Sequence, residues 1–189
     1  MKFSDGKNKL PDWLKKARMS WEYNGKGRPP FAKEPKKGQI SVWDFPRPPA
    51  IEKVKKEISV YQEKNCLAKT RNGYAIMETA HPPSYYIPPT DINQNFLIRI
   101  PNKKSLCEWK GSAIYWALKT DPEQAIAWSY PDPFSEFEAI KDHLAFYPQQ
   151  LNCFIKQEKV TPQPGKSYAG WITTNLVGPF KGEPGTGHW

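Results

Sequence analysis

Side chains that can do chemistry are concentrated in three short segments, residues 107–116, 127–133 and 143–148. Within them a lysine, a glutamate, a cysteine and a histidine are interspersed with tryptophan and tyrosine rings. This mixture is typical of a pocket that stacks a flat ligand against rings and orients it through a few polar groups. We predict a pocket for an unknown small molecule, flat or anionic, with these ligand-binding residues: Glu108, Trp109, Lys110, Tyr115, Trp128, Tyr130, His143 and Tyr147.

Glu108 and Lys110 are the pair from which acid–base chemistry is expected. They are two residues apart, so on a strand both side chains would point to one face. An ion pair among rings can shift the pKa of either group, and Lys110 would meet negative charge on the ligand. The alternative is an exposed ion pair that contributes little. If the protein is an enzyme, which the sequence leaves open, its catalytic candidates are Lys110, Glu108 and His143.

The remaining rings and the cysteines have less specific interpretations. Four rings form either a stacking cage or an ordinary small core: Trp109, Trp116, Trp128 and Tyr130. The three cysteines stand alone, without a C-x-x-C pair, so we predict no metal site and no cofactor. Pairing of Cys107 with a histidine as a nucleophile is a minor alternative.

The net charge of +9 is unevenly distributed over the 189 residues. Residues 1–40 hold eleven Lys and Arg against four Asp and Glu, whereas the rest holds seventeen against fifteen. The basic charge therefore belongs to an N-terminal extension, which can make weak contact with a polyanion. The sequence contains no apolar run of membrane-spanning length and no signal-peptide pattern, so we expect a soluble, cytoplasmic protein of unknown oligomeric state.

Apolar spacing predicts short strands separated by turns. Strands are expected over residues 57–62, 66–70, 74–79, 96–100, 106–118, 125–130 and 151–155. Twenty prolines disfavour long helices, so the body should contain one short helix, at residues 134–140. A second short helix, over residues 11–18, is expected in the extension.

The predicted fold class is mainly β, with two packed antiparallel sheets. The expected domain covers residues 41–160. It lies between a basic, largely irregular N-terminal extension, residues 1–40, and a C-terminal tail, residues 161–189, that wraps around the body. Both extensions are rich in Pro and Gly.

Five motifs stand out by their length: residues 42–48, 78–86, 107–116, 127–133 and 143–148. They begin Val-Trp-Asp-Phe-Pro, Glu-Thr-Ala-His-Pro, Cys-Glu-Trp-Lys-Gly, Ala-Trp-Ser-Tyr-Pro and His-Leu-Ala-Phe-Tyr. With these motifs the chain resembles the family known as domain of unknown function four-two-seven, over about residues 41–160. The tail segment 178–182 resembles a subset of that family. The resemblance implies a β-tent-like fold, in which two antiparallel sheets lean together at one edge.

The β-tent architecture includes the B-type methionine sulfoxide reductases and the ligand-binding domain of cereblon, which bind small groups in aromatic pockets. Many such domains hold zinc through two C-x-x-C pairs, which this chain lacks. The family is also labelled a nucleotidyltransferase domain. Polymerase-type nucleotidyl transfer needs carboxylates that hold metal ions, and no Asp-x-Asp follows Gly111-Ser112. The residues therefore disfavour that activity.

Three functions remain open from sequence. The leading hypothesis is a ligand-binding domain with an aromatic pocket and a Lys/Glu pair. The second is an enzyme that uses Lys110, Glu108 or His143 in acid–base chemistry. The third is a protein or nucleic-acid interaction module that acts through the basic N-terminal arm.

Overall fold

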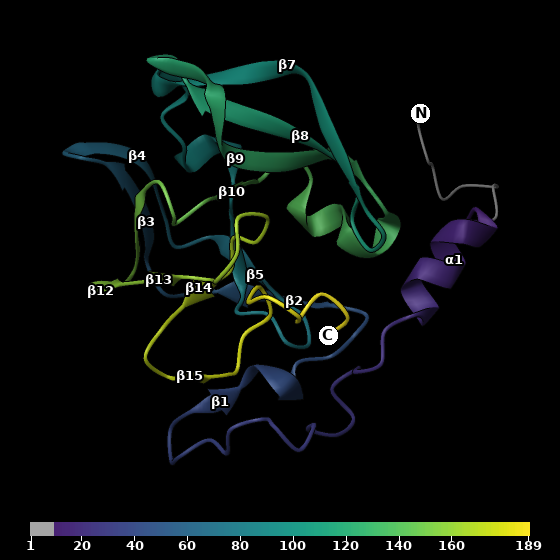
Figure 1. Ribbon diagram of the computed structural model, residues 1–189. Coiled ribbons are helices and arrows are strands. Elements are labelled where there is room, and N and C mark those ends of the chain that lie inside the picture. Colours follow the sequence, from purple (N-terminus) through teal and green to yellow (C-terminus); the bar gives the residue numbers. More distant parts are fainter. Residues whose placement is uncertain (1–9) are drawn as a thin grey trace.

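The computed structural model describes residues 10–189, so the first nine residues of the predicted extension lie outside it. The chain is built mainly from antiparallel strands (Figure 1). The larger sheet has seven strands in the order β2-β5-β6-β10-β9-β8-β7: β2 Ala50–Val54, β5 Gly73–Met77, β6 Ser84–Ile87, β10 Leu144–Phe146, β9 Asp121–Pro133, β8 Gly111–Leu118 and β7 Leu97–Cys107. The smaller has the order β12-β11-β3-β4: β12 Glu158–Lys159, β11 Asn152–Ile155, β3 Ile58–Gln62 and β4 Asn65–Thr70.

Two short strand pairs attach the chain ends to these sheets. β1 Ile40–Ser41 pairs in parallel with β15 Leu176–Val177. β13 Thr161–Pro162 pairs antiparallel with β14 Trp171–Ile172. The mainly β prediction with two principal antiparallel sheets is therefore confirmed.

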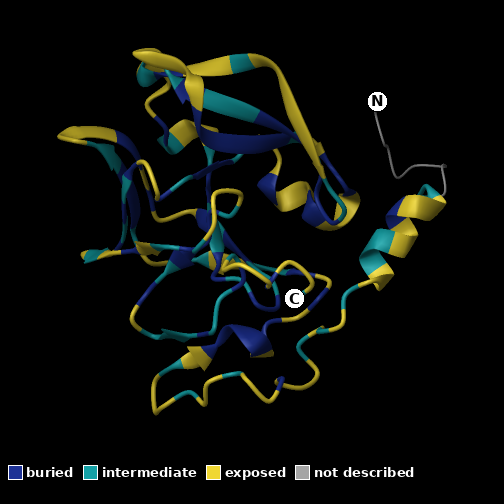
Figure 2. Ribbon diagram, viewed as in Figure 1, coloured by how far each residue is buried: buried dark blue, intermediate teal, exposed yellow. Residues whose placement is uncertain are grey.

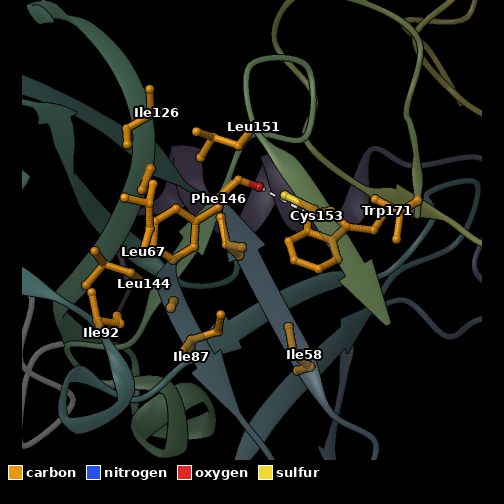
Figure 3. Close-up of a cluster of buried hydrophobic side chains, with 14 of the residues drawn as sticks. Ile58, Leu67, Ile87, Ile92, Ile126, Leu144, Phe146, Leu151, Cys153 and Trp171 are labelled. Atoms are coloured by element: carbon orange, nitrogen blue, oxygen red, sulfur yellow. Dashed lines mark hydrogen bonds between the residues drawn. The ribbon is translucent and has the colours of Figure 1, made fainter. Parts of the chain in front are cut away.

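The main core lies between the two principal sheets, because each contributes its apolar face (Figure 3). Ile58 and Leu67 come from the smaller sheet and Ile87 and Phe146 from the larger, and all four are fully buried. Trp171 from the tail completes the cluster, and its Nε1 donates a hydrogen bond of 3.0 Å to the Phe146 carbonyl. Each such side chain contributes about 1.5–3 kcal/mol by leaving water.

The prediction of one continuous strand over residues 106–118 is wrong. β7 ends at Cys107 and β8 begins at Gly111, so the segment is a hairpin with a tight turn over residues 108–110. Gly111 has φ +94°, a conformation that other residues adopt only with strain. The predicted end of the preceding strand at Pro101 is also wrong, because β7 continues through it. β7 is an edge strand, where a proline leaves no ladder bond unmade.

The helix predicted over residues 134–140 is a 3₁₀ helix, η4 Ser135–Ile140, kinked at Phe137. The described part of the chain has three further single-turn 3₁₀ helices: η1 Val42–Asp44, η2 Pro89–Asp91 and η3 Gln94–Phe96. The eight-residue α-helix lies in the extension, α1 Asp12–Met19, and buries Leu14. Trp13 next to it is 53% exposed, so Leu14 rather than Trp13 anchors the helix.

Both extensions pack on the body by their rings, although most of residues 10–40 are exposed or half-buried (Figure 2). Trp43 is fully buried and makes edge contacts with Tyr23 at 5.3 Å and Phe31 at 5.1 Å between ring centres. Trp189 from the other end stacks on Phe31 at 4.9 Å. No helix within residues 10–189 is both long and apolar enough to cross a membrane.

Arg47 connects the N-terminal extension to the body. Its side chain is 2% exposed and donates to the carbonyls of Tyr23 and Thr79 at 3.0 and 2.9 Å. Its Nε donates to Glu78 Oε1 at 3.2 Å. The guanidinium also lies 4.4 Å from the centre of the Trp21 ring. Every one of these partners loses its interaction if the guanidinium is removed.

We therefore expect Arg47→Met to destabilise the chain by roughly 3–5 kcal/mol, since it leaves a buried carboxylate and two carbonyls without a donor. The measurement is the free energy of unfolding in urea, with Arg28→Met as the control. Arg28 pairs with Asp44 and Glu34 at the surface, so its loss should change stability little. Equal effects of the two substitutions would contradict this assignment.

Candidate functional site

A cavity of about 240 Å³ opens on one face of the larger sheet. It is lined by rings, hydroxyls and a few charged groups: Ile76, Glu78, His81, Pro82, Ser84, Tyr86, Ser105, Cys107, Lys110, Ala113, Tyr115, Trp128, Tyr130, Tyr147, Gln163, Ser167, Tyr168 and Ala169. Lys110 and Glu78 are the charged members, so one positive and one negative group lie among rings and small polar or apolar side chains.

Strand alternation explains which residues of β7, β8 and β9 face the cavity. Tyr115 on β8 is the cross-strand partner of Trp128 on β9, and Tyr130 follows Trp128 by two residues. Side chains two apart on a strand share a face, so the three rings form one wall. Ser129, between them, points to the other face and accepts a hydrogen bond of 3.0 Å from Trp116 Nε1.

The opposite wall comes from segments without regular structure. Glu78 and His81 follow β5 in a stretch that two prolines keep extended or turning. The tail supplies Gln163 and Tyr168. Gln163 fixes this wall: its Oε1 accepts from the Gly170 N–H at 3.0 Å, and its Nε2 donates to the Lys181 carbonyl at 2.8 Å.

Lys110 carries the positive charge of the cavity although the residue is only 9% exposed. Burial alone would lower the pKa of its ammonium. Acidic groups on Cys107, Tyr86 and Glu78 outweigh burial and raise the pKa above its ordinary value. The ammonium is therefore protonated at neutral pH and available to an anionic or carbonyl oxygen.

Glu78 supplies the negative charge. Burial works against its ionisation, but neighbouring His81, Lys110 and Arg47 lower its pKa below the usual value. Its side chain is 16% exposed, and Arg47 holds Oε1 by the bond described above. The carboxylate is thus ionised, and its charge is shared between the cavity and the buried Arg47.

His81 is a neutral imidazole of defined tautomer. Because the Gln163 amide is oriented by Gly170, its Nε2 is the donor in the 2.9 Å contact with His81 Nδ1. Nδ1 therefore accepts, and the ring proton is on Nε2. Burial lowers the His81 pKa to about 4, in keeping with this assignment. The ring also packs edge-on against Tyr168 at 5.2 Å.

The aromatic side chains that line the cavity contact one another. Trp128 Nε1 donates to the Tyr86 hydroxyl at 3.2 Å, and Trp128 lies 4.9 Å from Tyr147 between ring centres. Burial raises the pKa of Tyr86 to about 12 and that of Tyr130 well above its ordinary value. These hydroxyls therefore stay protonated at neutral pH and act as hydrogen-bonding groups.

Five of the eight predicted ligand-binding residues line the cavity: Lys110, Tyr115, Trp128, Tyr130 and Tyr147. The other three lie outside it. Glu108 accepts a hydrogen bond at Oε1 from Trp21 at 3.1 Å, and Trp109 packs under Arg18 at 5.3 Å. His143 bonds the Lys141 carbonyl through Nδ1 at 2.9 Å.

The carboxylate in the cavity is therefore Glu78 rather than Glu108. Glu108 lies in the turn of the hairpin, so the shared strand face expected for it and Lys110 does not exist. Of the four rings predicted to form a cage or a small core, Trp128 and Tyr130 line the cavity. Trp109 belongs to the same buried cluster but lies beneath Arg18 of the extension, and Trp116 faces the main core.

The predicted set omits several polar residues that line the cavity, among them Glu78, His81, Gln163 and Tyr168. The first two lie in the motif Glu-Thr-Ala-His-Pro-Pro-Ser-Tyr-Tyr, whose paired prolines and tyrosines mark a rigid segment that presents side chains. The two tail residues give no comparable signal. Within residues 10–189, no group of three or more His, Cys, Asp and Glu side chains is arranged to hold a metal ion.

The fold is mainly β, and the cavity on its larger sheet is lined by rings together with one lysine and one glutamate. The chain belongs to the family described as Domain of unknown function (DUF427), whose model matches residues 50–157, more than half of the sequence. No curated protein matches the chain.

The neutral His81 makes stability depend on pH. Its pKa is about 4 in the fold against 6.5 in an unfolded chain, so only the unfolded chain gains this proton as pH falls from 6.5 towards 4. Stability should therefore fall by roughly 1–2 kcal/mol between pH 7 and pH 5. Urea unfolding of His81→Asn, whose Oδ1 can replace Nδ1 as the acceptor, should lack this loss.

His143→Asn is the matched control and should retain the full dependence. The charged groups near His81 do not titrate in this window: Glu78 ionises below it, and Lys181, whose pKa burial lowers to about 8, loses its proton above it. Arg47 and Lys110 stay charged throughout. A His81→Asn chain that loses stability as steeply as the parent would refute the neutral assignment.

Proposed function

We propose that the protein binds a small molecule with a planar ring and an anionic or carbonyl oxygen in the cavity. The observation that carries this proposal is the buried Lys110 ammonium, which faces an aromatic cavity of about 240 Å³ beside Glu78. A buried charge costs several kcal/mol unless it is compensated, so its presence in a cavity favours a functional role.

The size and lining limit the ligand. The cavity is smaller than the roughly 300–1,000 Å³ of sites for drug-sized ligands, so it accepts a single ring system. Trp128, Tyr130 and Tyr147 offer ring faces for stacking. Lys110 donates to an oxygen of the ligand, Glu78 accepts from a ring N–H, and His81 offers its Nε2 proton.

The test is native mass spectrometry of the chain purified without denaturation from the cells that naturally produce it. We expect an extra mass that is lost on denaturation. Lys110→Met should lower its occupancy, because loss of a charged hydrogen bond weakens binding by about tenfold to a hundredfold. Lys141→Met, at an exposed lysine outside the cavity, should leave the extra mass unchanged.

A cavity-filling variant guards against misfolding of Lys110→Met. Ala113 lines the cavity from β8, so Ala113→Leu adds apolar volume where the ligand would lie. We expect a folded chain without the extra mass. Retention of the extra mass in both Lys110→Met and Ala113→Leu would place the ligand elsewhere and contradict the proposal.

An acid–base enzyme is the second candidate, favoured because Lys110, Glu78, His81 and Cys107 line the same cavity. The acid–base groups of such an enzyme would include Glu78 and His81 in place of the predicted Glu108 and His143. Conversion of the bound molecule on prolonged incubation, abolished in Glu78→Gln while the extra mass is kept, would establish this activity. An unchanged molecule would favour binding alone.

A further inference from the structure

A second hollow continues from the mouth of the cavity. This basic groove, of about 550 Å³, is lined by Lys103, Lys104, Tyr115, Gln124, Ala125, Tyr147, Gln149, Gln150, Gly165, Lys166 and Ser167. Three of these residues, Tyr115, Tyr147 and Ser167, also line the inner cavity. The two spaces are therefore adjacent, and a molecule that passes Tyr115 contacts both.

The charged residues that line the groove are all positive. Among its lining residues are three lysines and no carboxylate. Lysines of one sign along a concave surface raise the local concentration of anions, and the ammonium group is a common ligand of phosphate. The three lysines are exposed, so they are free to meet an anion without the cost of desolvating a buried group.

The lysines are presented by specific local structure. The pairing of β7 with β8 shifts register between Arg99 and Lys104, and Asn102 within this bulge has φ +59°. A bulge re-aims the side chains that follow it. Lys103 Nζ accordingly lies 5.5 Å from the centre of the Tyr115 ring, at the boundary between groove and cavity (Figure 2 shows the exposed edge of β7).

The other side of the groove, which includes Lys166, is held by hydrogen bonds. Gln149 Nε2 donates to the carbonyls of Gln163 and Tyr168 at 3.1 and 2.6 Å, which fixes both ends of the loop that carries Lys166. Lysines on an edge strand also discourage pairing with other chains. That explanation does not extend to Lys166, which lies on this loop and faces the same groove.

We propose that the molecule bound in the cavity carries a phosphate, and that this phosphate lies in the groove between Lys103, Lys104 and Lys166. This inference rests on the proposed function and adds the class of ligand: a planar ring with a phosphorylated tail. The ring enters past Tyr115, whose hydroxyl is fixed by a 2.7 Å hydrogen bond with Ser105. The tail remains outside, where the volume admits a sugar phosphate.

The probes are adenosine, guanosine, cytidine and uridine 5′-monophosphates, each compared with its nucleoside and with inorganic phosphate by isothermal titration calorimetry. We expect at least one monophosphate to bind about tenfold or more tightly than its nucleoside, and the difference to shrink as salt rises. The triple variant K103Q/K104Q/K166Q should lose this preference while its nucleoside affinity is unchanged.

The matched control is K53Q/K55Q/K56Q, which removes the same charge from exposed lysines outside the groove and should keep the preference. Equal affinity for nucleotide and nucleoside would overturn the inference, as would a preference that survives in K103Q/K104Q/K166Q. Inorganic phosphate that binds as tightly as the monophosphates would show that the groove acts without the ring, and would also overturn it.

The same experiments test the proposed function independently of this inference. If none of the monophosphates binds, the ligand class is wrong, while the extra mass and its loss in Ala113→Leu still decide whether the cavity is a binding site. If a monophosphate binds and Ala113→Leu does not weaken it, the groove holds the molecule without the cavity, and the continuity claimed here is refuted.

Discussion

The buried ion pair between Arg47 and Glu78 is the constraint on which the rest of the site depends. Burial lowers the Arg47 pKa, yet the neighbouring Glu78 charge offsets part of that effect, and a guanidinium remains charged in any case. Its other donors are used by the carbonyls of Tyr23 and Thr79. One side chain therefore joins the N-terminal extension to the cavity wall that carries Glu78, and no neutral residue offers that many donors.

Glu78 connects the Arg47 ion pair to the cavity, because the same carboxylate interacts electrostatically with Arg47 and with Lys110. On the outer side, the Trp21 ring lies between two cations, 4.4 Å from Arg47 and 4.0 Å from Lys181 Nζ. Trp21 also donates to Glu108, which lies in the same turn as Lys110. The extension thus helps to support the cavity, although none of its described residues, 10–40, lines it.

Most of the longer strands and five of the residues that line the cavity could be predicted from sequence, whereas the interaction partners of these residues could not. Alternation places Trp128 and Tyr130 on one face and Ser129 on the other, but it does not tell which face carries the cavity. The hairpin turn was missed because apolar residues flank it on both sides and Gly111 resembles a bulge within one strand. Glu78 was missed because its role comes from Arg47, thirty-one residues earlier, which only the folded chain brings within 3.2 Å.

The cavity and the groove each combine residues of the segment that the family model matches with residues of the tail. Lys110 of the cavity and Lys103 of the groove lie within residues 50–157, whereas Gln163 of the cavity and Lys166 of the groove lie beyond them. The tail segment that carries Lys166 is held in place through main-chain carbonyls and the Gln163 amide. At Gly182 a side chain would collide with the backbone of Pro164. Side chains such as Lys166 take no part in that attachment. The charge of the groove can therefore change without disturbing the buried ions, which makes recognition of the ring and recognition of the tail physically separable.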